Sequence, residues 1–339
     1  MWMSASTIGL QHPQQFCLDR HFFSAEECTE FWSVLGGSYR WIQLSEGPLV
    51  GRLRIERNGA MVVVSMQANQ AMLVQGDRNP EWIPFTIEHT DNFSEHRHFG
   101  EVVVPHALGG FNTSLRETML RTSPGGNHIG AVLLERRRVH ELAAMDPAAA
   151  ILDRMAAHNQ ASLSESSHEQ LKCLMAPPQW AGEDSPRSFP ADLLEAQLFE
   201  CLSPSCEIDL RPVRDTHRSE LVHELVQYSF KFSRTPVQLN DVCSALFTTK
   251  TTLNVSCRKM FGFGPMMLMK RVRLQQVNHV LRSPDLQRRL GFKAVHEVAQ
   301  YFGFQSRNHF ASDYRSMFSE SPKETLLAAR SGSESFMHP

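Results

Sequence analysis

Two clusters of polar and basic side chains near the end of the chain could form specific hydrogen bonds. They are Lys250, Thr251, Asn254 and Arg258 in the first cluster, and Gln305, Ser306, Arg307, Asn308, Ser312 and Arg315 in the second. Arginine can bond O6 and N7 of guanine, and asparagine can bond N6 and N7 of adenine. These residue types therefore favour contact with base edges in a major groove. The alternative is an ordinary solvated surface, but both clusters place their polar groups alike.

Each cluster lies at the start of the second helix of an expected helix-turn-helix unit. The units span residues 239–262 and 295–318. Their first helices carry apolar residues three or four apart, namely Leu239, Val242 and Leu246, then Val295, Val298 and Phe302. Their second helices carry a narrow apolar seam, namely Leu253 and Phe261, then Phe310, Tyr314 and Phe318. The seam can pack the second helix on the first, which leaves a polar face free to enter a groove.

A single helix from Pro265 to Arg282 is expected to connect the two units. Proline is favoured in the first turn of a helix, and Pro284 ends this one. Lys270 and Arg273, together with Arg258 and Arg315, are expected to contact phosphates, which position a protein on DNA without specifying sequence. A rigid connection would hold two reading helices about one helical turn of DNA, roughly 34 Å, apart.

The segment from Arg218 to Leu326 resembles the DNA-binding domain of the AraC/XylS family of bacterial transcription regulators. The resemblance rests on the pattern from Leu253 to Gly262, on KRVRL at 270–274, and on EVAQYFGFQSRNHFASDYRSMF at 297–318. The FGFGP turn followed by LMKRVRL is most similar to the ethanolamine-operon activators of that family. The resemblance implies a sequence-specific, effector-responsive regulator that binds double-stranded DNA and RNA polymerase, and an activator as its mode of action.

Three positions depart from the family pattern. Phe247 stands in the first turn, where a small or polar residue is easier to accommodate if φ is positive. Cys257 stands where the family usually has a core phenylalanine, and Ser319 replaces the glycine that ends the second reading helix. Because the thiol fills less volume, the first unit is expected to pack less tightly than the second.

The charge of the chain divides at about residue 217. From His217 onward there are 17 Lys and Arg against 9 Asp and Glu, which leaves 17 basic and 27 acidic residues for the preceding part. A basic domain joined to an acidic one suits a polyanion-binding module with a partner domain. We expect an α+β chain with a sensor or dimerisation domain at 1–202, a linker at 203–216 and the DNA-binding domain at 217–330.

The N-terminal part reads as β-rich, with helices towards its end. Asn58-Gly59 separates two runs of alternating or valine-rich residues, which is a strong hairpin signal. Short strands at this spacing suggest a barrel or sandwich, and the family resemblance implies a β-rich sensor domain, often cupin-like. Trp41, Trp82 and Phe85 are candidates to line an effector pocket, although aromatic residues in strands more often belong to a core.

Neither a metal site nor an enzyme is expected. His96, His98 and Glu101 invite comparison with a metallocupin, but only two residues separate His98 from Glu101, where three or four are usual. The sequence contains no nucleophile elbow, phosphate loop or HExxH, so no catalytic residue and no cofactor is assigned. Two alternatives stay open: a metallocupin-type enzyme fused to a DNA-binding module, and a regulator that responds to a protein partner without a small-molecule ligand.

The remaining features favour a cytoplasmic protein. The seven cysteines are odd in number and form no CxxC, which is typical of reduced thiols. The first residues lack the pattern of a signal peptide, and no run approaches the ~20 apolar residues of a membrane span. We expect no membrane association, an effector of unknown identity and a possible second copy of the chain in a homodimer.

Overall fold

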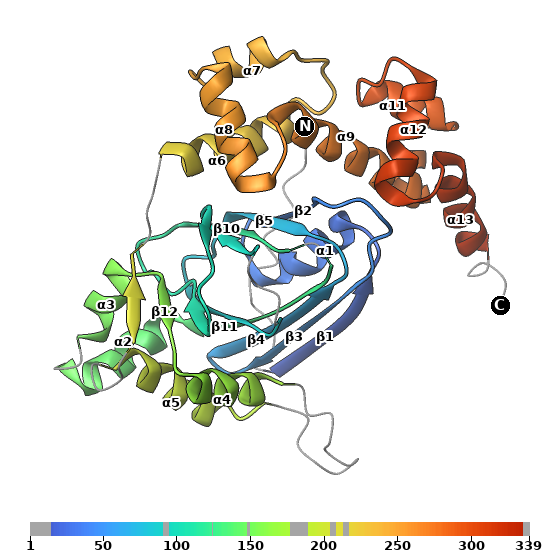
Figure 1. Ribbon diagram of the computed structural model, residues 1–339. Coiled ribbons are helices and arrows are strands. Elements are labelled where there is room, and N and C mark those ends of the chain that lie inside the picture. Colours follow the sequence, from blue (N-terminus) through green and yellow to red (C-terminus); the bar gives the residue numbers. More distant parts are fainter. Residues whose placement is uncertain are drawn as a thin grey trace.

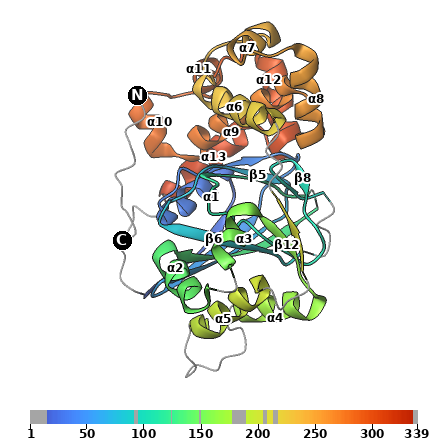
Figure 2. The same ribbon diagram turned by 90° about the vertical axis from the view of Figure 1, so that its left-hand side faces the viewer.

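The computed structural model describes residues 15–90, 95–123, 125–147, 150–176, 189–203, 208–212 and 217–334. The chain forms a β-rich domain, with helices beneath it and a second, helical domain above it (Figure 1). A quarter turn shows the same three levels (Figure 2). This arrangement confirms the expected α+β fold, in which a β-rich N-terminal domain precedes an all-helical C-terminal one.

The β-rich domain holds two antiparallel sheets. The larger sheet has the order β1 (Gln15–Phe22), β3 (Gly51–Asn58), β4 (Met61–Ala68), β11 (Asn127–Glu135), β6 (Trp82–Glu88), β9 (Ala107–Gly109), β12 (Gln160–Ser162) and β13 (Asp209–Arg211). The smaller sheet has the order β2 (Arg40–Gln43), β5 (Met72–Asp77), β10 (Glu117–Arg121), β7 (Arg97–His98) and β8 (Glu101–Val102). Strand β2 therefore lies at an edge of the smaller sheet.

The hairpin expected at Asn58-Gly59 is confirmed. Asn58 at the end of β3 pairs with Met61 at the start of β4, and Gly59 has a φ of 60°, a left-handed value that glycine adopts without steric cost. Helix α1 (Ala25–Trp32) begins after Ser24, whose hydroxyl accepts a hydrogen bond from the N–H of Glu27. Helix α1 lies beside β2.

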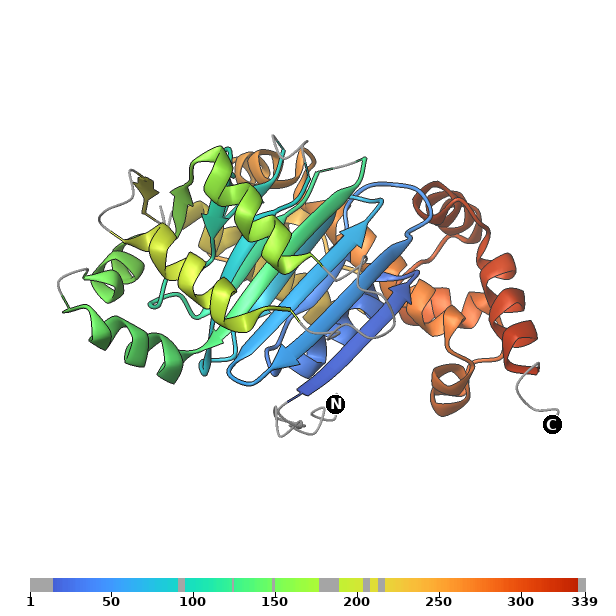
Figure 3. The same cartoon turned by 90° about the horizontal axis from the view of Figure 1, so that it is seen from below.

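Two hydrophobic cores lie on opposite faces of the larger sheet. The first fills the space between the sheets and α1, where Leu53, Ile55 and Met66 of the hairpin pack with Trp41 and Leu120. The second lies between the other face and the helices drawn in front of the sheet in Figure 3. These are α2 (Arg136–Met145), α3 (Ile151–Ala157), α4 (Glu165–Met175) and α5 (Ala191–Leu202).

Part of the segment expected to be a linker joins the larger sheet. Within 203–216, Asp209–Arg211 form β13 and pair with β12, a strand that the sequence did not indicate. Residues 204–207 and 213–216 lie outside the described residues. Three residues in extended conformation can form backbone hydrogen bonds with an open sheet edge whatever their side chains are. The sequence of such a short strand therefore shows no periodic pattern that would predict it.

The C-terminal domain consists of eight described helices. They are α6 (His217–Lys231), α7 (Leu239–Ala245), α8 (Lys250–Phe261), α9 (Pro265–Arg282), α10 (Pro284–Leu290), α11 (Val295–Tyr301), α12 (Arg307–Phe318) and α13 (Pro322–Glu334). The connecting helix α9 has the expected bounds. The short helix α10 was not predicted: Ser283 caps it by accepting from the N–H of Leu286, and Pro284 occupies its first turn.

The first helix-turn-helix unit and the smaller sheet share one hydrophobic core. Ile42, Leu73 and Met119 point away from the space between the sheets and pack with Leu225 of α6 and Met260 of α8. The second unit has a core of its own, in which the end of α9 packs with α11, α12 and α13. The β-rich domain therefore holds the first unit through apolar packing as well as through the chain connection.

Two further expectations concern cysteines and membranes. The described cysteines are all free thiols, and Cys206 lies outside the described residues. Within the described ranges, no helix combines the length and the apolar character needed to cross a bilayer.

Candidate functional site

The first reading helix exposes two of its predicted contact residues at its start. Thr249 caps α8 by accepting a hydrogen bond from the N–H of Thr252, and Lys250 and Thr251 are exposed on the first turn. Arg258, about two helical turns further along α8, is also exposed. These residues are free to contact a ligand.

Asn254 is less free than the sequence suggested. Its Nδ2 donates a 2.9 Å hydrogen bond to the carbonyl oxygen of Lys250, one turn earlier in α8. Its Oδ1 lies against Gly264, where an added Cβ would come within 3.0 Å of it. Asn254 therefore lies between α8 and the FGFG turn, with one amide hydrogen bonded to its own helix.

The second reading helix exposes its whole predicted cluster. Ser306 caps α12 by accepting from the N–H of His309, as predicted. Gln305, Arg307, Asn308, Ser312 and Arg315 are all exposed. The predicted seam of Phe310, Tyr314 and Phe318 is buried, and the Tyr314 hydroxyl accepts a 2.7 Å bond from Asn278 of α9. Burial raises the pKa of Tyr314 well above its usual value, so its hydroxyl stays protonated.

Two residues predicted as phosphate contacts are engaged within the protein. Lys270 of α9 lies 2.8 Å from Asp313 of α12, and both side chains keep about a third of their exposure. Arg273 donates a 2.9 Å bond from Nη2 to the carbonyl oxygen of Thr235, and burial lowers its pKa. Arg273 thus joins α9 to the segment before α7, and its assignment as a phosphate contact stays a prediction.

The three departures from the family pattern lie at strained or buried positions. Phe247 has a φ of 47° and Ser319 a φ of 59°, both left-handed values that favour glycine. Phe247 is also 97% exposed, so its ring is free of the core. Cys257 is fully buried, and burial raises the pKa of its thiol to about 12, which keeps the thiol neutral and unreactive.

The β-rich domain touches the far ends of both reading helices. Arg121 donates a 3.1 Å bond to the carbonyl oxygen of Met260 in α8. At α12, Ser316 donates a 2.7 Å bond to Glu46, and the N–H of Gly47 donates a 2.9 Å bond to the carbonyl oxygen of Met317. The starts of α8 and α12 remain exposed, so these contacts hold the helices without covering the polar clusters.

Gln275 of α9 forms several hydrogen bonds with the β-rich domain. Its Oε1 accepts a 2.9 Å bond from the N–H of Gln43, and its Nε2 donates a 3.1 Å bond to the carbonyl oxygen of Trp41. The side-chain amide therefore bonds the open edge of β2 as a neighbouring strand would. Gln275 also donates a 3.2 Å bond to Glu26 of α1.

Comparison with known proteins agrees with this geometry. Residues 242–328 match the family described as a helix-turn-helix domain. The C-terminal part of the chain is a helix-turn-helix domain. The HTH-type transcriptional activator RhaS of Citrobacter koseri is 24% identical over 164 residues, which cover 48% of this chain and 55% of that protein. The chain thus spans about half the length of the curated relative that it matches. Together these matches support the expected place of this domain among AraC/XylS regulators.

Solved structures of similar proteins include two kinds. A probable AraC family transcriptional regulator from Rhodopseudomonas palustris is 28% identical and covers 32% of this chain and 97% of that chain, with a TM-score of 0.29. ToxT from Vibrio cholerae is 9% identical and covers 93% of this chain and 97% of that chain, with a TM-score of 0.31. TM-scores this low convey no detail of a site.

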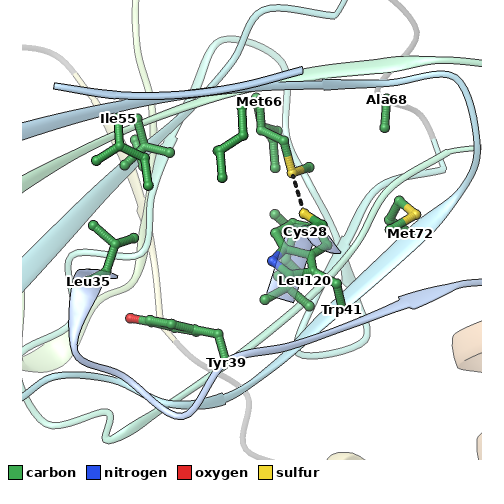
Figure 4. Packing of buried hydrophobic residues seen from close by; sticks show 14 of the residues in the cluster. Cys28, Leu35, Tyr39, Trp41, Ile55, Met66, Ala68, Met72 and Leu120 are labelled. Atoms are coloured by element: carbon green, nitrogen blue, oxygen red, sulfur yellow. Dashed lines mark hydrogen bonds between the residues drawn. The ribbon is translucent and has the colours of Figure 1, made fainter. Parts of the chain in front are cut away.

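Beneath the helix-turn-helix domain, the β-rich domain contains a cavity between its two sheets. The space inside it that the centre of a water-sized sphere can occupy is about 50 Å³, so the cavity is narrow. Trp41, predicted to line an effector pocket, lies in its wall beside Trp32, Tyr39 and Leu120. Figure 4 shows Tyr39, Trp41 and Leu120 on the side of this core facing Ile55 and Met66.

The other two predicted pocket residues lie elsewhere. Trp82 is buried in the first core without lining the cavity, and its ring lies under the guanidinium of Arg57 at 5.2 Å. Phe85 is fully buried in the second core, on the opposite face of the larger sheet, where it stacks on Phe111. Strand alternation places Phe85 and its neighbours on the two faces, and the sequence alone did not show which face borders the cavity.

Sequence reasoning missed Arg78, the charged residue of the cavity wall. It follows β5 in an exposed-looking run of Asp, Arg and Asn, yet only 8% of it is exposed. A single arginine in a polar turn carries no sequence signal of burial, because only the closure of the sheets covers it.

The histidines near β7 form internal hydrogen bonds. His96 lies 2.9 Å from Glu88 and 3.0 Å from Ser123, and His98 bonds Asn159 at 3.1 Å. Burial lowers the pKa of His98 to about 3, so its ring is neutral. Within the part of the chain that the structure describes, no three His, Cys, Asp or Glu side chains converge as a metal site would require.

Proposed function

We propose that this chain is a DNA-binding transcription regulator that inserts α8 and α12 into two successive major grooves. The observation that carries the proposal is the shared form of the two units. Each exposes polar and basic residues at the capped start of its second helix, and both are attached to the single helix α9. A recognition helix contacts base edges with its first residues, which is where Lys250, Thr251, Arg307 and Asn308 lie.

The two reading helices are assigned different tasks in this proposal. Arg307 and Asn308 are exposed beside a firmly packed aromatic seam, so they are suited to reading bases. Lys250 and Thr251 are equally exposed, but Asn254 is bonded to its own helix. We assign sequence reading mainly to α12, and a larger share of backbone contacts to α8, with Arg258 and Arg315 facing phosphates.

The β-rich domain is proposed to sense a small molecule and to pass the response to α9. Its cavity borders Trp41, and the main chain of Trp41 is bonded by Gln275. A ligand that moves β2 or α1 would therefore change the position of α9, the helix to which both helix-turn-helix units are attached. The proposal assigns the chain no enzymatic activity.

The mode of action is proposed from similarity alone. RhaS is described as a transcriptional activator, and we propose activation, with RNA polymerase as a partner and a homodimer as the acting form. The resemblance to ethanolamine-operon activators rests on FGFGP and LMKRVRL, which lie in the DNA-binding domain. It suggests a related operator and does not specify the ligand of the cavity.

Binding titrations of the full chain on selected operator DNA and on scrambled DNA would test the proposal. Arg307→Ala should cost about 1–3 kcal/mol of binding free energy on the operator and relax one base position. Arg137→Ala is the matched control, because Arg137 is exposed on α2, at the opposite end of the molecule (Figure 2). Equal losses for both variants, or no preference of the wild type for any DNA, would contradict the proposal.

A further inference from the structure

A buried guanidinium with a free donor faces the cavity between the two sheets. Arg78 donates from Nε to Thr118 at 3.0 Å and from Nη1 to the carbonyl oxygen of Gly110 at 2.8 Å. Its Nη2 is buried and has no hydrogen-bond partner. Among the described residues, no carboxylate forms an ion pair with Arg78.

This arrangement is costly unless something compensates it. Burial lowers the pKa of Arg78 to about 10, so the group remains charged at neutral pH. His98, in the same wall, is neutral and cannot balance the charge. A buried charge without an oppositely charged partner is unfavourable, and such departures occur mainly at functional sites.

Two further unpartnered donors border the same space. The indole Nε1 atoms of Trp32 and Trp41 are buried without hydrogen-bond partners, and both residues line the cavity with Arg78. All three orphaned atoms carry N–H groups and therefore require an acceptor. The rest of the wall is mostly aliphatic, with Val64, Val74, Leu120, Ile129, Ala131 and Leu133.

We propose that this cavity binds the carboxylate of a slender apolar organic acid, with Arg78 as its charged anchor and Trp41 as a second donor. The unpartnered Nη2 of Arg78 can donate a charge-assisted hydrogen bond to a carboxylate oxygen, and an apolar wall suits an aromatic ring or a short alkyl chain. One cation and neutral N–H groups balance a single negative charge, which favours a monocarboxylate over a phosphate. The gaps between the side chains are narrow, so a flat or linear acid is expected.

The inference rests on the proposed function only where it concerns the effect of the bound acid on the DNA-binding domain. Trp41 joins the cavity to the DNA-binding domain, because its N–H donates a 2.9 Å bond to Thr29 of α1 and its carbonyl oxygen accepts from Gln275 of α9. A carboxylate that bonds the Trp41 indole would reposition β2 against α9. Binding of the acid itself requires no DNA.

Thermal unfolding of the full chain without DNA tests the inference. The probes are benzoate and hexanoate, each compared with the neutral amide of the same shape, benzamide or hexanamide, and with inorganic phosphate. The acids should raise the Tm with concentration, whereas the neutral analogues and phosphate should not. Equal shifts from the neutral analogues, a shift from phosphate alone, or no shift from either acid would overturn the proposal.

Substitutions locate the site. Trp41→Phe keeps an aromatic ring, although a smaller one, and removes the N–H. It should weaken acid binding about tenfold, as a lost hydrogen bond to a charged group does. Arg78→Met should abolish it. The control is Trp82→Phe, the same substitution at a buried tryptophan outside the cavity. If Arg78→Met fails to fold, the comparison of Trp41→Phe with Trp82→Phe tests the site by itself. Equal affinities of these two variants for the acid would refute the site.

The two proposals can fail separately. Acid binding that depends on Trp41 and Arg78, in a chain that prefers no DNA sequence, would leave the cavity assignment standing and remove the regulator. Sequence-specific DNA binding in a chain that ignores both acids would do the reverse.

Discussion

The side-chain amide of Gln275 donates a 3.1 Å hydrogen bond to the carbonyl oxygen of Trp41. This bond joins α9, to which both helix-turn-helix units are attached, to β2, whose Trp41 lines the cavity. The same amide accepts from the N–H of Gln43, so it bonds two main-chain groups of the β2 edge. A change in β2 therefore reaches α9 through two directional bonds, in addition to the apolar packing of the shared core.

Gln275→Ala should loosen the edge of β2. The variant leaves two buried backbone groups without partners, and each unmade bond costs about 1–3 kcal/mol. Amide hydrogen exchange in a peptide covering residues 40–44 should become at least about tenfold faster, since roughly 1.4 kcal/mol corresponds to a factor of ten. Gln276→Ala is the control, because Gln276 contacts Glu26 and has no described bond to β2. Equal acceleration in both variants would show that β2 is held by packing alone.

Asp313→Asn should strengthen DNA binding. Asp313 neutralises Lys270, and its loss would free one cation next to the reading helix. Each additional phosphate contact steepens the dependence of log K on log salt by about 0.9. Titrations at several salt concentrations measure the slope. Asp285→Asn removes the same charge from α10, where Asp285 pairs with Arg288. The local explanation fails if both variants change affinity and slope equally.

Ser319→Gly should stabilise the second unit by about 0.5–1 kcal/mol. Ser319 ends α12 with a φ of 59°, which costs an L-residue roughly 1–2 kcal/mol, partly offset by the greater freedom of glycine in the unfolded chain. Urea unfolding measures the change. Ser312→Gly, in the interior of the same helix, should instead destabilise it by roughly 0.5 kcal/mol. A loss of stability at Ser319 would mean that its side chain contributes more than its backbone strain costs.

Glu26 should make the domain contact sensitive to pH. One carboxyl oxygen, Oε2, is buried without a partner, although the residue as a whole keeps some exposure. Burial raises the pKa of Glu26 to about 8, with Glu30 and Glu27 of the same helix adding to the shift. His279 of α9, which lies 4.0 Å from Glu30, also faces this region, and burial lowers its pKa.

The sign follows from proton binding. The folded pKa lies above the unfolded value of about 4.3, so the folded state binds more protons between these values. The contribution of Glu26 to the free energy of unfolding is therefore fully present below about pH 4.3, and it is lost as the pH rises towards 8. Glu26→Gln should remove this loss and stabilise the chain increasingly from pH 5 to pH 8, as measured by chemical unfolding at each pH. Parallel curves for variant and wild type would contradict the assignment.

The sequence by itself determined the C-terminal domain closely. The bounds of α9, the cap at Ser306, the buried seam of Phe310, Tyr314 and Phe318, and the exposed Arg307 and Asn308 all follow from signals within one or two helical turns. The β3–β4 hairpin and the cap of α1 are equally local. Caps, helical periodicity and tight turns depend on residues that are neighbours in the sequence, so they can be predicted from one amino-acid sequence.

Only the tertiary structure decided the contacts between distant segments. Lys270 and Arg273 are predicted phosphate contacts, and the sequence did not show that Asp313 and the carbonyl oxygen of Thr235 lie beside them. Strand β13 adds to a sheet edge, and Arg78 becomes a buried cation because two sheets close over it. Burial and long-range pairing depend on which surfaces meet, and residue type or period within one segment does not encode that choice.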